Sequence, residues 1–239
     1  MDISRYVAGI VQKVTEFVLN KKFSHGKILT FHQVCDDQSK WDGTNCAITQ
    51  KGFNKLIETL KIGNAEILQM DMLPDCRGNQ QTVWLTFDDA YEDVYTNVYP
   101  LLLKNKMPFA VFLTVELLDQ QKYLKTEQVQ EMLASGLCVV GAHTVSHGML
   151  SKMTSEKARK EIFESKAQLE KIFSITVDIM AYPYGSVYAC RKRHRRDAEL
   201  AGYRMAFSTI DSTLPAVSDA FFLPRINVNE NNYLWVASR

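Results

Sequence analysis

The chain has 239 residues, of which 46% are hydrophobic and 10% aromatic, enough to fill a sizeable core. This composition excludes a disordered or fibrous protein. The 28 lysine and arginine residues nearly balance 27 aspartate and glutamate residues, and the net charge of +1 excludes nucleic acid as the main partner. Five cysteines occur without a Cys-X-X-Cys pair, which predicts reduced, mostly buried thiols rather than a disulfide framework or a structural zinc site.

The start of the chain predicts an amphipathic helix over residues 1–26, because apolar side chains recur there at steps of three and four residues. Its acidic residues argue against a targeting sequence, and no apolar run in the chain is long enough for a membrane span. We therefore expect a soluble, cytoplasmic protein, although a mature form supplied without its leader would look the same. No linker composition divides the sequence, so we expect one domain over residues 1–239.

Beyond this segment, short β-branched or aromatic runs alternate with longer runs of helical period, which is typical of βα units with a parallel sheet. Strands are predicted at Lys27–Phe31, Thr82–Phe87, Phe109–Thr114, Cys138–Ala142, Val177–Tyr182 and Arg204–Ser208. Helices are predicted at Thr49–Lys61, Ala90–Lys106, Thr126–Ser135, Thr154–Phe173 and Val187–Ala201. The helix from Thr154 carries capping residues at its start, and Glu156 suits its positive end.

Polar residues with metal-binding side chains follow three of these predicted strands. His32 comes directly after the first strand, Asp88 and Asp89 follow the second, and His143 follows the fourth. The carboxyl ends of parallel strands share one rim of a barrel or open α/β sheet, where active sites assemble. We therefore expect these residues, which are far apart in sequence, to converge.

His143 and His147 are four residues apart, so a helical turn would bring both imidazoles within reach of one divalent cation. Together with a carboxylate they predict a two-His, one-Asp site that leaves positions open for water and substrate, as catalytic metal sites do. Neighbouring strand residues point in opposite directions, so one carboxylate of Asp88-Asp89 would bind the metal while the other accepts a proton from bound water. Alternatively, the pair caps the helix predicted from Ala90, and both functions can coexist.

Three segments resemble the first three motifs of the polysaccharide deacetylase family, the NodB-type carbohydrate esterases. They are Thr86-Phe87-Asp88-Asp89-Ala90, His143-Thr144-Val145-Ser146-His147 and Tyr182-Pro183-Tyr184-Gly185. The similarity covers most of the chain and is nearest in layout to the poly-N-acetylglucosamine deacetylase branch. It implies an α/β fold, a distorted seven-stranded (β/α) barrel over residues 27–230, and hydrolysis of an N-acetyl group on an amino sugar of a polysaccharide or glycan precursor. It also implies one divalent metal, zinc in the first place, with Co, Ni, Mn or Fe as alternatives.

The resemblance further implies a role for each matching residue. Asp88 would be the general base, and the metal ligands would be Asp89, His143 and His147. The third motif would line one wall of the groove, with Pro183 at the substrate and the backbone amide of Tyr184 at the oxyanion. The metal and this amide together would stabilise the oxyanion that forms when water attacks the acetyl carbonyl.

The chain departs from the family pattern at two points. Many members have an arginine in the third motif, where this chain has Ala181 and Tyr182, so the partner that orients Asp88 must come from elsewhere. Arg225 is the candidate substitute, and it is grouped with the substrate and oxyanion residues. Many also have a late histidine that protonates the leaving amine, but the only late histidine here, His194, lies in a predicted helix. In the poly-N-acetylglucosamine branch this acid comes from an early strand end, which matches His32; a structural or substrate-contacting role is the alternative.

The altered third motif keeps two other functions open. One is a catalytically weak or inactive sugar-binding protein, and the other is a hydrolase of a different linear amide or formamide. The basic run Arg191–Arg196 predicts a solvated helix face. The alternative is a functional run that attracts phosphate on a lipid-linked sugar or an acidic glycan, with the protein at the periphery of a membrane. Tyr91, Tyr95 and Tyr99 predict a packing stripe, with Tyr91 near the groove. The oligomeric state is not predicted.

Overall fold

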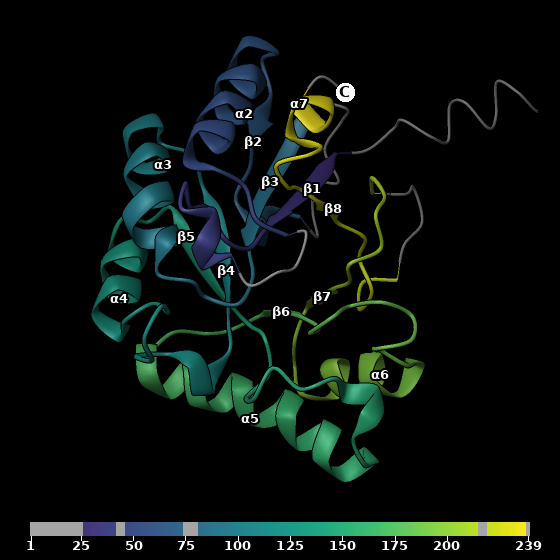
Figure 1. Ribbon diagram of the computed structural model, residues 1–239. Helices are drawn as coiled ribbons and strands as arrows, with labels where there is room; N and C mark the ends of the chain where they lie inside the picture. Colours follow the sequence, from purple (N-terminus) through teal and green to yellow (C-terminus); the bar gives the residue numbers. More distant parts are fainter. Residues whose placement is uncertain (1–25, 42–45, 74–80, 215–218, 238–239) are drawn as a thin grey trace, which may run out of the picture.

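The computed structural model describes residues 26–41, 46–73, 81–214 and 219–237, and it shows a curled parallel sheet surrounded by helices (Figure 1). The helix predicted over residues 1–26 lies outside the described residues, apart from Gly26. None of the described helices combines the length and the apolar composition needed to cross a bilayer.

The sheet contains eight strands within the described residues, all paired in parallel. They are β1 (Lys27–Phe31), β2 (Glu66–Ile67), β3 (Thr82–Phe87), β4 (Phe109–Leu113), β5 (Cys138–Ala142), β6 (Ile179–Ala181), β7 (Met205–Phe207) and β8 (Ile226–Asn227). Seven of them follow the order β7-β6-β5-β4-β3-β1-β8, and β2 pairs with the beginning of β3 outside this path. All six predicted strands are confirmed, with ends that differ by up to two residues; β2 and β8 are too short for a periodic signal.

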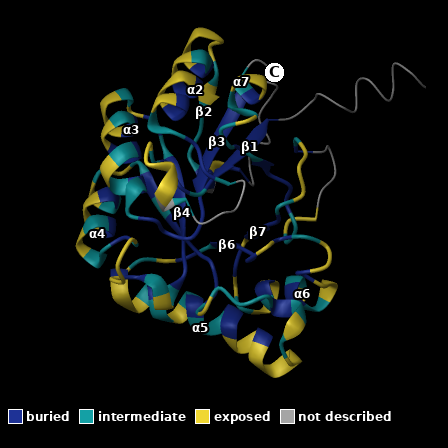
Figure 2. Ribbon diagram, in the orientation of Figure 1, coloured by how far each residue is buried: buried dark blue, intermediate teal, exposed yellow. Residues whose placement is uncertain are grey.

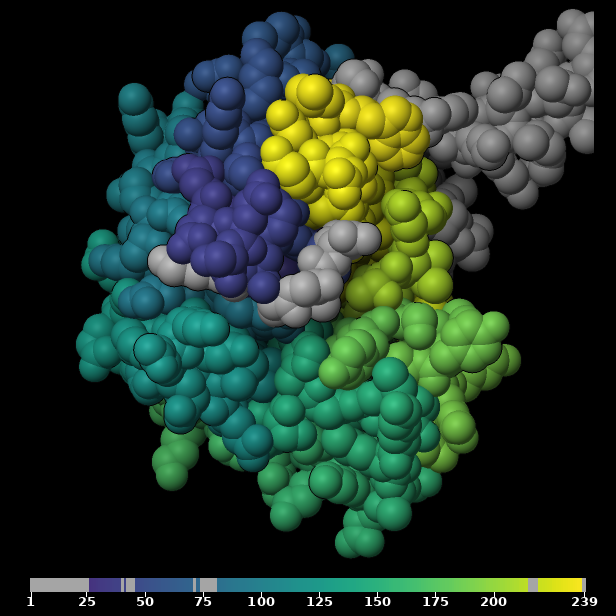
Figure 3. Space-filling view, in the orientation of Figure 1, coloured from purple at the N-terminus to yellow at the C-terminus, as the bar shows by residue number. Residues whose placement is uncertain are grey.

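The sheet closes into a distorted barrel through the chain around β8. Leu223 forms a parallel bridge with Phe207 of β7, and Ile226 three residues later pairs with Leu29 of β1. The segment therefore joins the two edges of the sheet, which is the barrel that the resemblance implies. Figure 3 shows the consequence on one face, where the purple beginning and the yellow end of the described chain lie side by side.

Helices cover the outside of the sheet, with buried residues on one side and exposed residues on the other (Figure 2). They are α2 (Gln50–Ile62), α3 (Tyr99–Asn105), α4 (Thr126–Ala134), α5 (Ser155–Phe173), α6 (Lys192–Leu200) and α7 (Tyr233–Ala237). Short turns η1 (Gln38–Lys40), η2 (Met70–Met72), η4 (Val115–Leu117) and η5 (Leu150–Lys152) are 3-10 helices, and η3 (Val94–Val98) is a π-helix. The predicted cap of α5 is confirmed, because the Thr154 side chain accepts a hydrogen bond from the Lys157 amide.

Two predicted helices begin later than expected. The segment from Ala90 turns first, since Asp89 and Ala90 both have left-handed backbones with φ of 66° and 61°. It then forms η3. Pro100 has no amide hydrogen and cannot continue the hydrogen bonding of this π-helix, so α3 starts only at Tyr99. The prediction that Asp88-Asp89 caps a helix is therefore wrong.

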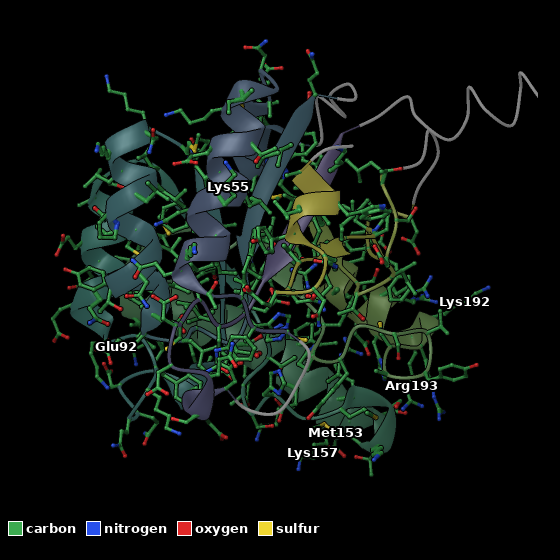
Figure 4. All side chains as sticks on the ribbon, turned by 45° about the horizontal axis from the view of Figure 1, so that its top comes forward. Lys55, Glu92, Met153, Lys157, Lys192 and Arg193 are labelled. Atoms are coloured by element: carbon green, nitrogen blue, oxygen red, sulfur yellow. The ribbon has the colours of Figure 1, made fainter. Side chains whose placement is uncertain are left out.

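The helix predicted from Val187 begins at Lys192. Residues 186–190 form a separate turn, in which the amides of Ala189 and Cys190 both donate to the Ser186 carbonyl. Arg191 then has an extended backbone, with ψ of 163°, and serves as the residue before α6. The basic residues that follow make α6 mainly a peripheral element: Figure 4 shows Lys192 and Arg193 at the edge of the molecule, and Arg193 Nη2 donates to the Met153 carbonyl at 3.4 Å.

Candidate active site

The ends of β1, β3 and β5 bring the predicted polar residues to one cavity. His32, Asp88, Asp89 and His143 line it together with His147, and its volume is about 670 Å³. The strand pairing explains this convergence, since the Asp88 amide donates to the Phe31 carbonyl beside His32. The five residues that the sequence placed at strand ends or in the His-X-X-X-His segment therefore share one site.

Asp89, His143 and His147 form a group whose ligand atoms all lie within 4.8 Å of one another. Asp89 Oδ1 is 2.8 Å from His147 Nε2 and 3.3 Å from His143 Nε2, yet this buried oxygen makes no hydrogen bond of good geometry. A buried carboxylate oxygen that faces two imidazole nitrogens without a shared hydrogen bond fits a divalent cation, and the donor set suits zinc and similar metals.

The two histidines do not sit on a helix, as their spacing had suggested. Thr144 and His147 both have left-handed backbones, with φ of 66° and 58°, and the segment is an irregular loop. The loop nevertheless places the two ring centroids 4.9 Å apart. The predicted proximity is confirmed, but its predicted cause is wrong.

His143 is oriented by a hydrogen bond on the far side of its ring. Its Nδ1 lies 2.8 Å from the Ala181 carbonyl, which can only accept, so Nδ1 carries the proton and Nε2 is left for a metal. Burial alone would lower the pKa of His143, but the carboxylates of Asp89 and Asp88 raise it overall. Burial would likewise raise the pKa of Asp89, but the imidazoles of His143 and His147 hold it well below its ordinary value.

Asp88 lines the same cavity and forms a buried ion pair. Arg225 Nη1 donates to Asp88 Oδ1 at 2.8 Å and Nη2 donates to Oδ2 at 2.6 Å, and both residues are 1% exposed. Arg225 is fixed in turn by the Ser208 carbonyl at 3.0 Å from its Nε. Burial alone would raise the pKa of Asp88, but Arg225, with smaller effects of His143 and His32, lowers it below its ordinary value.

Arg225 thus supplies the arginine that the third motif lacks, from a segment far along the chain. The prediction that Arg225 substitutes as the partner of Asp88 agrees with these two hydrogen bonds. Arg225 does not line the cavity, so its place among the residues that contact the substrate or oxyanion is not supported. Pro183 is also buried and does not line the cavity. Of the predicted substrate group only Tyr184 reaches the cavity.

Tyr184 lies in the cavity wall beside His147, and Gly185 belongs to the same turn. The Tyr184 ring is 54% exposed and lies 5.2 Å from the His147 ring, while its backbone is left-handed with φ of 61°. Gly185 has φ of 36°, and a Cβ there would lie 2.5 Å from the Thr209 amide nitrogen. This turn explains the glycine of the third motif, and the Tyr184 amide donates to no acceptor within the described part of the chain.

His32 lines the same cavity and is partly buried. Its Nδ1 is buried without a hydrogen-bond partner among the described residues, in contrast to Nδ1 of His143. His194 is buried in α6, where its Nδ1 accepts from the Arg191 amide, and burial with the neighbouring Arg193 and Arg191 charges lowers its pKa to about 4. This supports the prediction that His194 is no active-site acid.

The sequence interpretation missed one residue near the site, Glu161 of α5. It is 7% exposed, and its carboxylate accepts hydrogen bonds from the loop between His143 and His147. The sequence contains a sign of this contact, because Glu161 lies on the buried face of α5 with Ala158 and Ile162. An acidic residue on an apolar helix face requires a partner, but the sequence does not name it.

The wall of the cavity also contains an aromatic pair that differs from the predicted tyrosine stripe. Tyr95 and Tyr99 stack with ring centroids 5.8 Å apart, as expected for successive turns. Tyr91 precedes the helix and stacks on Tyr123 instead, with centroids 5.2 Å apart. Both Tyr91 and Tyr123 line the cavity, so the prediction that Tyr91 lies near the groove is confirmed.

The sequence profile of the polysaccharide deacetylase family matches residues 76–206, more than half of the chain. The chain belongs to the polysaccharide deacetylase family. A poly-β-1,6-N-acetyl-D-glucosamine N-deacetylase of Staphylococcus aureus strain MRSA252 is 26% identical over 211 residues, which cover 79% of this chain and 70% of the relative. This relative agrees with the branch indicated by the sequence.

Two solved structures share the fold of this polysaccharide deacetylase. IcaB from Ammonifex degensii has a TM-score of 0.78 at 22% identity, over 91% of this chain and 97% of that chain. The Streptococcus pyogenes deacetylase PplD, in complex with acetate, has a TM-score of 0.79 at 21% identity, over 91% of this chain and all of that chain, 100%. Family membership makes the chain a hydrolase of the polysaccharide deacetylase type, which acts on an amide bond.

Proposed function

We propose that this chain is a metal-dependent hydrolase that removes the N-acetyl group from an amino-sugar unit of a polysaccharide. The observation that carries the proposal is the meeting of two groups in one cavity: the ligand set of Asp89, His143 and His147, and the Asp88 carboxylate held by Arg225. The Staphylococcus aureus relative, by its name a deacetylase of poly-β-1,6-N-acetyl-D-glucosamine, supports an amino-sugar polymer as substrate.

Asp89, His143 and His147 would hold the cation. A bound divalent ion polarises an acyl oxygen and lowers the pKa of a water molecule in the site. Zinc is the first candidate because one carboxylate and two imidazoles are its usual catalytic ligands, and Co, Ni, Mn and Fe are alternatives.

Asp88 is the proposed general base. A base must be ionised to accept a proton from the attacking water, and the two hydrogen bonds from Arg225 hold the carboxylate in its ionised form. They also fix the plane of the carboxylate, since a guanidinium binds both oxygens at once. Arg225 is therefore proposed to orient the base rather than the substrate.

His32 is the proposed general acid for the leaving amine. An acid must gain and lose a proton during turnover, and Nδ1 of His32 is bound to no structural partner among the described residues. The Tyr184 amide is proposed to donate to the oxyanion of the tetrahedral intermediate. The exposed Tyr184 ring beside His147 would contact the sugar.

The altered third motif, which lacks the arginine, favours the inactive, sugar-binding alternative. Arg225 pairs with Asp88 from another part of the chain, so the altered motif gives this alternative less support. A hydrolase of another linear amide or formamide has the same requirements, so the acyl group needs a direct comparison.

The test measures acetate release from N-acetylglucosamine oligomers by metal-stripped protein after Zn, Co or Ni is added back. We expect activity only with added metal, and loss of activity in Asp88→Asn and His143→Ala. Glu58→Gln, at an exposed position of α2, is the control variant and should behave like the parental protein. Full activity in both site variants would refute these roles, and glycan binding without turnover on any metal would favour the inactive alternative. N-formyl substrates assayed in parallel separate the two acyl groups.

A further inference from the structure

The loop between the two proposed histidine ligands has no helical or strand hydrogen bonding of its own. Helical residues bond to each other, but this loop is irregular and contains two left-handed residues, Thr144 and His147. Thr144 is β-branched, for which a left-handed backbone is unfavourable. The loop therefore depends on hydrogen bonds from other parts of the fold to keep both imidazoles together.

One side of the loop is held by the end of β4 and by η4. The Thr114 hydroxyl lies 3.2 Å from the His143 carbonyl, the Val115 amide 3.3 Å from the Thr144 carbonyl, and the Glu116 amide 3.0 Å from the Val145 carbonyl. These contacts satisfy successive carbonyl oxygens. They leave the amide hydrogens on the other side of the loop in need of acceptors.

Glu161 supplies those acceptors from the second turn of α5. Its Oε2 accepts from the amides of Val145 at 3.0 Å and Ser146 at 2.9 Å, and its Oε1 accepts from the Ser146 hydroxyl at 2.7 Å. The carboxylate thus makes three hydrogen bonds to two consecutive residues that lie between the ligands. Because Glu161 belongs to a 19-residue helix, it anchors the loop to a rigid element.

We propose that Glu161 is a positioning residue for the metal site, which holds the loop so that His143 and His147 are prearranged for one cation. The inference rests on the proposed function for the identity of the ligands. Glu161 itself does not line the cavity and touches neither imidazole in the described contacts. Its effect should therefore appear in metal affinity before it appears in any chemical step.

The test is titration of metal-stripped protein with Co²⁺, followed by visible absorption. Glu161→Ala should weaken Co²⁺ binding about 10- to 100-fold, the range seen when groups that orient metal ligands are removed. Glu161→Gln should restore most of this loss, because its amide oxygen can accept from both backbone amides while its NH₂ donates to the Ser146 hydroxyl. Ser165→Ala is the matched control, since Ser165 is buried in the same helix and, among the described residues, its hydroxyl bonds only to Ile162 and Tyr203. The control should bind Co²⁺ like the parental chain.

Binding by Glu161→Ala within about threefold of the parental chain would overturn the proposal, as would an equal loss in the Ser165→Ala control. If Glu161→Ala does not fold, Ser146→Ala removes only the 2.7 Å bond and should weaken binding about fivefold; unchanged binding there overturns the proposal. A parental chain that binds no Co²⁺ contradicts both this inference and the proposed function. Co²⁺ binding with the expected order of variants but no acetate release contradicts the proposed function alone.

Discussion

Replacement of Arg225 by methionine tests the buried pair that holds the proposed base. Arg225 and Asp88 are both 1% exposed and share two hydrogen bonds of 2.8 and 2.6 Å, so the variant leaves a carboxylate buried without its partner. Removal of one member of such a pair costs about 3–5 kcal/mol of unfolding free energy. For a chain of this size, that corresponds to a fall in melting temperature of roughly 6–20 °C.

The effect should depend on pH with a defined sign. In the parental chain Arg225 keeps the pKa of Asp88 below its ordinary value. The ion pair therefore stabilises the folded chain fully at pH values above the pKa of Asp88 in the unfolded chain, and this stabilisation is lost as pH falls through the pKa of Asp88 in the folded chain. In Arg225→Met the largest lowering effect is lost, and burial then raises the pKa of Asp88 against the smaller effects of His143 and His32, so protonation relieves the unpaired charge. The difference in stability between the two chains is therefore largest near pH 7 and shrinks on acidification.

Urea unfolding, followed by fluorescence of the buried Trp84, measures the difference. The double variant Asp88→Leu with Arg225→Met removes both charges and should recover at least about half of the loss, since an apolar pair of similar volume often replaces a buried ion pair without large cost. An Arg225→Met variant within about 1 kcal/mol of the parental chain at pH 7 would refute the reasoning.

Three further predictions follow from other residues. Burial raises the pKa of Asp93 to about 7, so the folded chain loses stability as pH rises from about 4 to 7. Asp93→Asn can still accept a hydrogen bond from the Val34 amide and should be more stable than the parental chain at pH 8 by at most about 4 kcal/mol. Equal midpoints of urea unfolding at pH 8 would contradict this. His32→Ala should lower kcat for an N-acetyl amino sugar about 10²- to 10⁴-fold. Hydrolysis of 4-nitrophenyl acetate should be affected far less, because the 4-nitrophenolate leaves without a proton. Equal losses of kcat on both substrates would exclude the role of general acid. Gly185→Ala should lower stability by about 1–3 kcal/mol in thermal unfolding, because its Cβ meets the Thr209 backbone, and an unchanged melting temperature would show that the turn adapts.

The strands and the residues at their ends could be predicted from the sequence. In a parallel sheet covered on both faces, strands such as Thr82–Phe87 are buried along their whole length, so they appear as short apolar runs. The polar residue that ends such a run, Asp88 or His143, is then conspicuous. The rule that these ends share one rim is independent of side-chain detail, and the common cavity follows from it.

The local conformation at the site could not be predicted in the same way. The spacing of His143 and His147 suggested a helical turn, but left-handed residues bring the imidazoles together instead. Asp88-Asp89 suggested a helix cap, but Asp89 turns the chain toward the histidines. A four-residue spacing or a pair of aspartates is compatible with several backbone paths, and contacts with distant segments select one of them.

The sequence by itself determined the alternation of strands and helices, the family, and which polar side chains meet in the candidate site, because burial periodicity and motif spacing are local properties of the chain. Only the tertiary structure decided which partners those side chains have. Arg225 reaches Asp88 across 137 positions of sequence, and Glu161 reaches the ligand loop from a helix that follows it. Such contacts arise where barrel closure and helix packing bring remote segments together, and no local pattern encodes that meeting.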